Sequence, residues 1–410
     1  MDLASFVTDS GSIFRDFNSN FMMNRDDSGP SCRGTLWTGI AHAFTATIGS
    51  GILALPWCMG QLGWILGPFV LVSFAAITYY TAIHLCDCYR TPDPVNGRRN
   101  YNYMGAVRAL LGPRNVLICG IIQYSNLWGS MIGYTITTVI SMAALKRSIS
   151  CFHEKGRSAR CDVSANKYML LYGAFEVILS QCPNLEKAAF LSVVAAVTSL
   201  LYSFIVIGLS TAKLISSHFD FKGSLMVAHQ SSMDMDMPSS TKIWHVFQAF
   251  GNLAFAFNYT TLLLEIQVYA QPVFAVHERW LGSTWPTSFL NRIHTIKITF
   301  IHNFTIHFTP GRLLLRSIFV TFTTLVAMIF PFFNAVLGFI GALSFWPLTV
   351  YFPLTMYTVQ ANIKRGSSTW IVFQVLGLVS MVVTLIAAVG SIADILENSK
   401  HAKLFHIDQL

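Results

Sequence analysis

The chain has 410 residues, of which 53% are hydrophobic and only 11% are charged. An ordinary globular protein carries about 25% charged residues, so this composition excludes a set of water-soluble domains. The 32 Phe, 14 Tyr and 9 Trp exclude a disordered chain, because they bring far more buriable surface than such chains possess. The net charge of +8 accompanies no nucleic-acid-binding motif. The composition therefore predicts a polytopic protein of the lipid bilayer, with no nucleic acid as a partner.

Nine segments are long and apolar enough to cross a bilayer, which takes about 20 residues. They cover residues 35–60, 64–87, 115–145, 167–182, 188–212, 243–267, 313–331, 335–359 and 369–396. A basic stretch at residues 88–114 marks the cytosolic side, which places the N-terminus inside. Residues 1–32 hold several Asp and no long apolar core, so we expect a cytosolic tail and no signal peptide.

Two glycines flank a serine in the middle of the first segment. The residues concerned are Ile48, Gly49, Ser50 and Gly51. A helix can unwind there, and the freed amides at the start of the next half-helix favour an anionic group such as a carboxylate. The alternative is close helix packing through small residues. That packing role also fits two further glycine pairs, Gly63 with Gly67 and Gly129 with Gly133.

The sixth segment carries a second possible interruption inside an aromatic stretch. Its candidate residues are Gly251, Asn252, Phe255 and Phe257. An unwound helix here would offer free carbonyls to an ammonium group. Two interrupted helices in corresponding halves of a chain indicate the central site of a transporter. The aromatic run could instead pack against lipid or core.

Ionisable residues at membrane depth are costly and therefore indicate function. The candidates are His42, His84, Glu176 and Glu265. His42 lies about two turns before the first interruption and could take part in proton coupling. It could equally be a neutral histidine that donates to a neighbouring carbonyl. Glu176 could relay protons or pair within the bundle, and Glu265 could simply sit at the inner membrane interface.

Two cysteines, Cys151 and Cys161, lie in a loop that the topology places outside, where they could form a disulfide or remain free thiols. Between residues 296 and 308, apolar and polar residues alternate as in a β-hairpin or extended segment. On such a strand His302 and His307 fall on opposite faces, so we predict no metal site. The chain holds no recognised catalytic or cofactor-binding motif, so we expect neither an enzyme nor a cofactor.

Together these residues resemble the plant amino acid permeases, which form part of the amino acid/auxin permease branch of the APC superfamily. The resemblance runs from about residue 33 to residue 395. Its blocks are Gly34-Thr-Leu-Trp-Thr, Ala41-His, Ile48-Gly-Ser-Gly-Ile-Leu, Gln61-Leu-Gly-Trp-Ile, Asp87-Cys-Tyr-Arg-Thr-Pro-Asp-Pro-Val, Ile122-Gln-Tyr-Ser-Asn-Leu, Gly133-Tyr-Thr-Ile, Leu191-Ser-Val-Val-Ala-Ala-Val, Phe247-Gln-Ala-Phe-Gly, Leu264-Glu-Ile-Gln and Gly341-Ala-Leu-Ser-Phe-Trp-Pro-Leu-Thr-Val-Tyr-Phe-Pro.

The resemblance implies a LeuT-type inverted-repeat helical bundle that moves amino acids into cells together with protons, most simply across the plasma membrane. Residues 48–51 would then meet the substrate carboxylate, and residues 251–257 would flank its ammonium group and side chain. His42 would be a candidate for proton coupling. Many members carry an acid at the position of Asn252.

This chain departs from the family after Gln267. The family places a loop and two further membrane passes there, whereas Val268 follows directly here. The resemblance therefore implies an internal deletion of at least ~40 residues of spanning sequence, with two helices lost from the second repeat. A shortened carrier that senses amino acids or modulates full-length relatives, without transport, is the alternative function. The expected segments are a tail (1–32), six membrane helices with the first and sixth broken (33–267), a shortened inner connection (268–312), three last helices (313–396) and a C-terminal tail (397–410).

Overall fold

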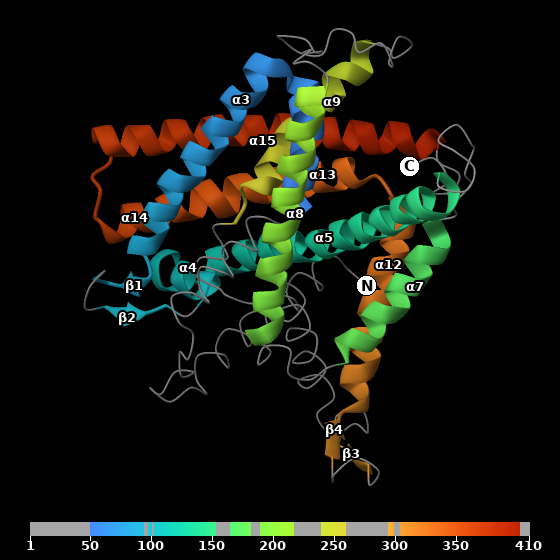
Figure 1. Cartoon of the computed structure of the whole chain (residues 1–410). Coiled ribbons are helices and arrows are strands. Elements are labelled where there is room, and N and C mark those ends of the chain that lie inside the picture. The colour runs from blue at the N-terminus through green and yellow to red at the C-terminus, as the bar shows by residue number, and fades with distance from the viewer. Residues whose placement is uncertain are drawn as a thin grey trace.

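The computed structural model describes residues 50–93, 97–100, 102–152, 165–181, 189–216, 239–259, 294–298 and 304–401. Helices dominate these ranges (Figure 1). They are α3 (Ser50–Asp87), α4 (Tyr103–Leu111), α5 (Pro113–Lys146), α7 (Ala165–Ser180), α8 (Ala189–Ser216), α9 (Ser239–Ala256), α12 (Pro310–Ile329), α13 (Phe333–Ser344), α14 (Phe352–Gln360) and α15 (Ser368–His401), with π-helical turns η1 (Arg147–Phe152) and η4 (Phe345–Tyr351). The strands are β1 (Arg90–Thr91), β2 (Arg98–Arg99), β3 (His294–Ile298) and β4 (Phe304–Phe308).

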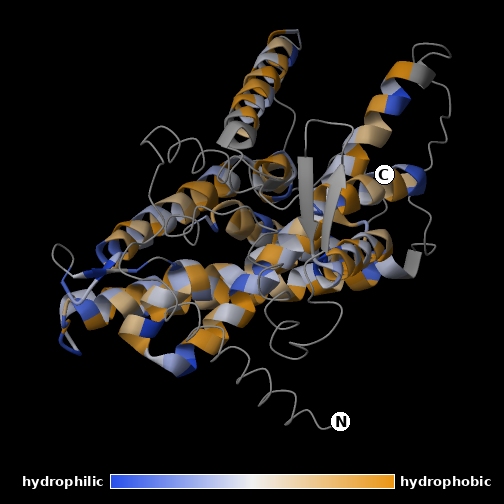
Figure 2. Ribbon diagram, turned by 90° about the horizontal axis from the view of Figure 1, so that it is seen from below, coloured by the Kyte–Doolittle hydropathy of each residue, from blue (hydrophilic) through white to orange (hydrophobic). Residues whose placement is uncertain are grey.

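Within the described residues, six helices are long and apolar enough to cross a membrane by length and composition. Apolar residues run along most of the helical lengths (Figure 2). Every predicted spanning segment has a helical counterpart. Residues 50–60 of the first segment and all of the second lie in α3, and the fourth and sixth segments correspond to the shorter helices α7 and α9. The predicted fold class, a polytopic helical membrane protein, is therefore confirmed.

Helix α3 is a hairpin of two helices that turn at Gly63, where φ is 80° and ψ is 179°. This backbone conformation favours glycine, because a β-carbon would clash with the chain. In Figure 1 the hairpin rises from the middle of the molecule to the top of the view and returns along the left-hand side. The prediction that Gly63 packs helices together is wrong, since Gly63 forms the turn. Gly67 does pack closely, because its β-carbon would lie 2.7 Å from the sulfur of Met59.

Helix α9 occupies the centre of the bundle, between α3, α13 and α15. Glycines bring these helices together. A β-carbon on Gly251 of α9 would collide with the backbone of Gly338 in α13, and one on Gly390 of α15 would collide with Phe247 of α9. Lipid is as apolar as a leucine side chain, so such close packing, more than hydrophobic burial, holds membrane helices together.

The predicted packing glycines of the third segment behave as expected. Gly129 and Gly133 lie on α5, where added β-carbons would meet the side chains of Ile340 and Leu337 on α13. Both glycines are buried. The small residues of α5 therefore let α13 approach its surface, and the packing prediction for this pair is confirmed.

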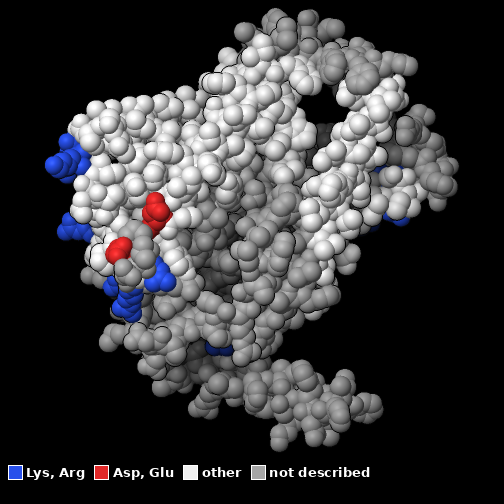
Figure 3. All heavy atoms as spheres, turned by 60° about the vertical axis from the view of Figure 1, so that its left-hand side comes forward, with Lys and Arg blue, Asp and Glu red and all other residues white. Residues whose placement is uncertain are grey.

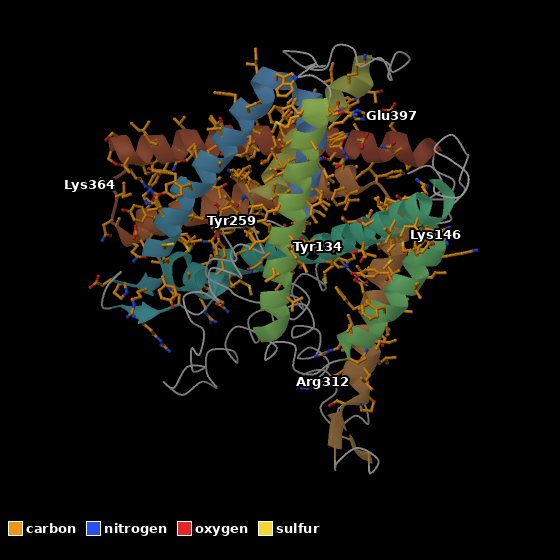
Figure 4. All side chains as sticks on the ribbon, in the orientation of Figure 1. Tyr134, Lys146, Tyr259, Arg312, Lys364 and Glu397 are labelled. Atoms are coloured by element: carbon orange, nitrogen blue, oxygen red, sulfur yellow. The ribbon has the colours of Figure 1, made fainter. Side chains whose placement is uncertain are left out.

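On the face shown in Figure 3, most of the charged side chains lie together at the left-hand end. There the Nε2 amide of Gln360, at the end of α14, donates to the carbonyls of Asp87 at 3.0 Å and of Arg90 at 2.9 Å. Lys364, in the turn between α14 and α15, lies at the same end as β1 and β2 (Figure 4). Two segments that the predicted topology places in the cytosol are thus neighbours.

Strands β3 and β4 form an antiparallel hairpin in which Ile296 lies opposite Ile306. The hairpin occupies the segment where alternating apolar and polar residues predict it. Across the described part of the chain, no group of three or more His, Cys, Asp or Glu residues could hold a metal ion.

Candidate functional site

The start of α3 meets the end of α9 inside the bundle. Gly51, the second residue of α3, is buried, and an ideal β-carbon on it would lie 2.6 Å from the Cα atom of Ala256. Ala256 is the last residue of α9. The two segments that the sequence predicts to form one site are therefore in direct contact, although about two hundred residues separate them in the chain.

Helix α9 ends at Ala256 through a tightened last turn. The amide of Phe257 donates to the carbonyl of Leu253 at 3.1 Å, and the amide of Asn258 donates to the carbonyl of Phe255 at 3.2 Å. The carbonyl of Phe257 accepts a hydrogen bond of 3.3 Å from the hydroxyl of Thr78 in α3. Carbonyls at a helix end lack partners within the helix and carry partial negative charge, so this end favours a cation such as an ammonium group.

Asn258 fixes the chain just beyond α9 through a buried hydrogen-bond network. Its Nδ2 amide donates to Oδ1 of Asn126 at 3.2 Å and to Oγ of Ser344 at 2.7 Å. Its Oδ1 atom accepts from the hydroxyl of Thr349 at 2.8 Å. The four side chains come from α5, the end of α9, α13 and η4, and all are buried. The network therefore anchors the end of α9 to the helices around it.

Sequence reasoning did not assign Asn258 a role. The only signal is an amide side chain inside an apolar membrane segment, which predicts hydrogen bonds across helices without naming the partners.

The predicted interruption at Gly251 is displaced. Gly251 lies inside continuous α9, and the helix ends only after Ala256. The physical reason is packing, because the missing β-carbon of Gly251 admits the backbone of Gly338. Asn252 is fully buried beside the Cys58 thiol of α3.

The two aromatic candidates flank the helix end. Phe255 and Phe257 are partly buried against a core cluster that includes Ala54 of α3 and Leu337 of α13. They supply an apolar wall next to the place where α9 ends. This arrangement suits the side chain of a small zwitterion better than its charged groups.

Several predicted residues lie outside the described part of the chain. These are His42, Ile48, Gly49, Cys161 and Glu265. Ser50 is the first residue of α3, and its side chain is not among the described ones. The break before Gly51, the proposed disulfide and the role of His42 stay predictions.

The two described ionisable candidates are not at the meeting point of α3 and α9. His84 lies among aromatic rings, with its ring centroid 4.2 Å from that of Tyr357. Glu176 lies on α7, where its carboxylate accepts a long hydrogen bond of 3.4 Å from Thr135 of α5. Figure 1 shows α7 beside α12 on the right-hand side of the view, apart from α9. The structure therefore does not bring Glu176 to the place where α3 and α9 meet.

Comparison with known proteins gives one consistent result. A family profile described as "Transmembrane amino acid transporter protein" matches residues 32–268 and 262–397. The chain is 39% identical over 461 residues to "Amino acid permease 8" of Arabidopsis thaliana, covering 93% of this chain and 95% of that protein. It is 39% identical to "Amino acid permease 1", covering 93% of each chain, and 38% identical to "Amino acid permease 6", covering 95% of each, both from Arabidopsis thaliana. No solved structure matches the chain.

Proposed function

Because the chain belongs to the transmembrane amino acid transporter family, we propose that it carries amino acids across the plasma membrane together with protons. The observation that carries this proposal is the buried contact between Gly51 and Ala256, where the start of one helix faces the end of another. A transporter of zwitterions needs one place that favours a carboxylate and another that favours an ammonium group.

The two helix ends supply opposite partial charges. Amides at the start of α3, in residues 48–51, would bind the substrate carboxylate. Carbonyls at the end of α9, near Phe257, would bind its ammonium group. The effect of these dipoles is larger inside the bundle than in water, because the surrounding dielectric constant is low. Phe255 and Phe257 would then face the substrate side chain.

Proton coupling is assigned by the same proposal to His42 and Glu176. His42 precedes the start of α3 along the chain, so a proton on its ring would add positive charge near the carboxylate end of the site. Glu176 is bonded to Thr135 on a different side of the bundle, so it would act through movement of α5 and α7.

The internal deletion after Gln267 forms part of the proposal. The family profile matches the chain in two separate parts, residues 32–268 and 262–397, which overlap at residues 262–268. The alignment with Amino acid permease 8 runs over 461 residues, although this chain has 410. Both observations support a first half of residues 33–267 followed by a shortened second repeat.

Uptake of radiolabelled amino acids by cells that express the chain tests the proposal. The matched control is the same chain with the two missing helices restored, and surface biotinylation gives the amount of each protein at the plasma membrane. We expect uptake that a protonophore abolishes. If only the restored chain transports, at equal surface abundance, this product is not a carrier and a sensing or modulating role takes its place.

A further inference from the structure

A line of polar contacts connects α9 with α15 at the end of α9 that begins with Ser239. The hydroxyl of Thr241 donates to Oε1 of Glu397 at 3.0 Å. One turn further along α9, Nε2 of His245 lies 3.2 Å from Oδ1 of Asp394. Asp394 is 6% exposed, so this pair is held inside the bundle.

The line continues inward with polar groups that have no partner. The side-chain amide of Gln248 is buried, and neither its nitrogen nor its oxygen has a hydrogen-bond partner among the described residues. The same holds for the hydroxyl of Ser391 on α15. The two side chains are neighbours, because a β-carbon on Gly338 would lie 2.7 Å from Oγ of Ser391 and 3.2 Å from Cγ of Gln248.

Asn252 completes the line at its inner end. Its amide is fully buried, and its polar neighbour is the Cys58 thiol, a weak partner. The α9 residues are spaced by four, three and four positions, which places them on one face of the helix. We call this line the polar seam, and it comprises Thr241, His245, Gln248, Asn252, Ser391, Asp394 and Glu397. Figure 4 shows Glu397 at one end of α9 and Tyr259 just beyond the other.

A dry seam of this composition would be unfavourable. Buried amides and hydroxyls in proteins find hydrogen-bond partners, and where protein groups are lacking the partner is ordered water. Two side-chain amides and a hydroxyl at consecutive turns offer donors and acceptors to several water molecules. Asp394 and His245, near the Ser239 end, supply an ionisable pair that water can reach, because the His245 side chain is 18% exposed.

We propose that the polar seam binds a file of water molecules that leads from the Ser239 end of α9 to Asn252, one turn before the candidate substrate site. The predicted topology places the Ser239 end outside. The seam is then an aqueous connection between the outer medium and the buried end of α9. The idea that this water carries the protons that accompany the substrate rests on the proposed function. The presence of water in the seam does not depend on it.

Radiolytic hydroxyl-radical footprinting of the full chain in lipid nanodiscs tests this proposal without any substitution. Hydroxyl radicals formed from bound water oxidise the side chains next to that water, so a buried thiol is oxidised quickly only where water lies beside it. Cys58 and Cys119 are both fully buried. Cys58 adjoins the inner end of the seam, whereas Cys119 packs in a separate apolar cluster with Val107 and Leu348. We expect mass spectrometry to show several-fold faster oxidation of Cys58, and equal slow oxidation of both thiols would overturn the proposal.

Gln248→Leu provides the second measurement. It removes the buried amide and keeps a side chain of similar length, so Cys58 oxidation should fall to the level of Cys119. The control is Thr198→Val on α8, whose exposed hydroxyl bonds only to its own helix among the described groups. Unchanged oxidation of Cys58 in a folded Gln248→Leu protein would show that water reaches Cys58 by another way, and the seam proposal would be wrong. Both experiments measure oxidation of cysteines and not transport. Their outcome therefore stays valid even if the chain carries no amino acids.

Discussion

Gly51 of α3 lies so close to Ala256 of α9 that an added β-carbon would come within 2.6 Å of the alanine Cα atom and 3.3 Å of its amide nitrogen. The neighbouring group is backbone, which cannot rotate away as a flexible side chain can. The contact therefore sets how closely the two helix ends can approach, and any substrate held between them depends on that spacing.

Gly51→Val should reduce amino acid uptake to background. The branched side chain would push the start of α3 away from the end of α9. Gly49→Val should have the same effect, because a side chain there would hinder both the predicted unwound backbone and the approach of a carboxylate. The measurement is radiolabelled uptake normalised to surface abundance.

The control for this prediction is Gly60→Val on the same helix, where an added β-carbon meets no heavy atom within 4 Å. This variant should transport normally. Full activity of the Gly51→Val variant would show that the contact between the two helix ends is not part of the substrate site.

Gly251→Ala should destabilise the folded protein by ~1–3 kcal/mol, the usual cost of overpacking a tight interior. The new methyl group would overlap the carbonyl of Gly338, which is part of the α13 backbone. The midpoint of thermal unfolding in detergent, followed by tryptophan fluorescence, should fall. Gly377→Ala on α15 is the matched control, since nothing lies within 4 Å of its β-carbon and its helix should gain ~1 kcal/mol. Equal midpoints for the two variants would contradict the packing role.

Thr349→Val should lower both stability and uptake. The substitution keeps the shape of the side chain but removes the hydroxyl that donates to Oδ1 of Asn258. A buried acceptor left without its donor costs ~1–3 kcal/mol. Thr355→Val is the control, because the hydroxyl of Thr355 is exposed and donates to a carbonyl of its own helix. A thermal melt and an uptake assay on both proteins check the prediction, which is wrong if the two variants behave alike.

His42→Ala should leave the protein folded and change how uptake depends on external pH. In a proton-coupled carrier, uptake rises as external pH falls, and loss of the coupling group should flatten that rise. Uptake measured across a pH series checks this, with surface abundance as the test of folding. An unchanged profile would move the coupling role to Glu176, and Glu176→Gln would then be the next variant.

Much of the fold could be predicted because the bilayer imposes a length on every crossing. The segments 115–145 and 313–331, for example, correspond to α5 and α12, and every helix end lies within about three residues of its predicted place. The contact between the glycine motif of the first segment and the interruption of the sixth also follows from the general arrangement of broken helices in transporters.

The exact end of α9 could not be predicted. A glycine in a membrane helix fits both an interruption and a close helix contact, and the choice depends on what faces it. For Gly251 the facing residue is Gly338, which belongs to a helix far along the chain. The network of Asn258 is hidden for the same reason, since Asn126 and Thr349 come from distant helices.

The bonds of Asn258 have a consequence for how the protein is made. Asn126 is already present when α9 is made, but Ser344 and Thr349 are synthesised long afterwards, so Asn258 lacks these two partners until α13 and η4 have followed. Until then the nascent chain holds an incompletely bonded amide side chain at membrane depth, which is costly and gives the later helices a polar group to pack against.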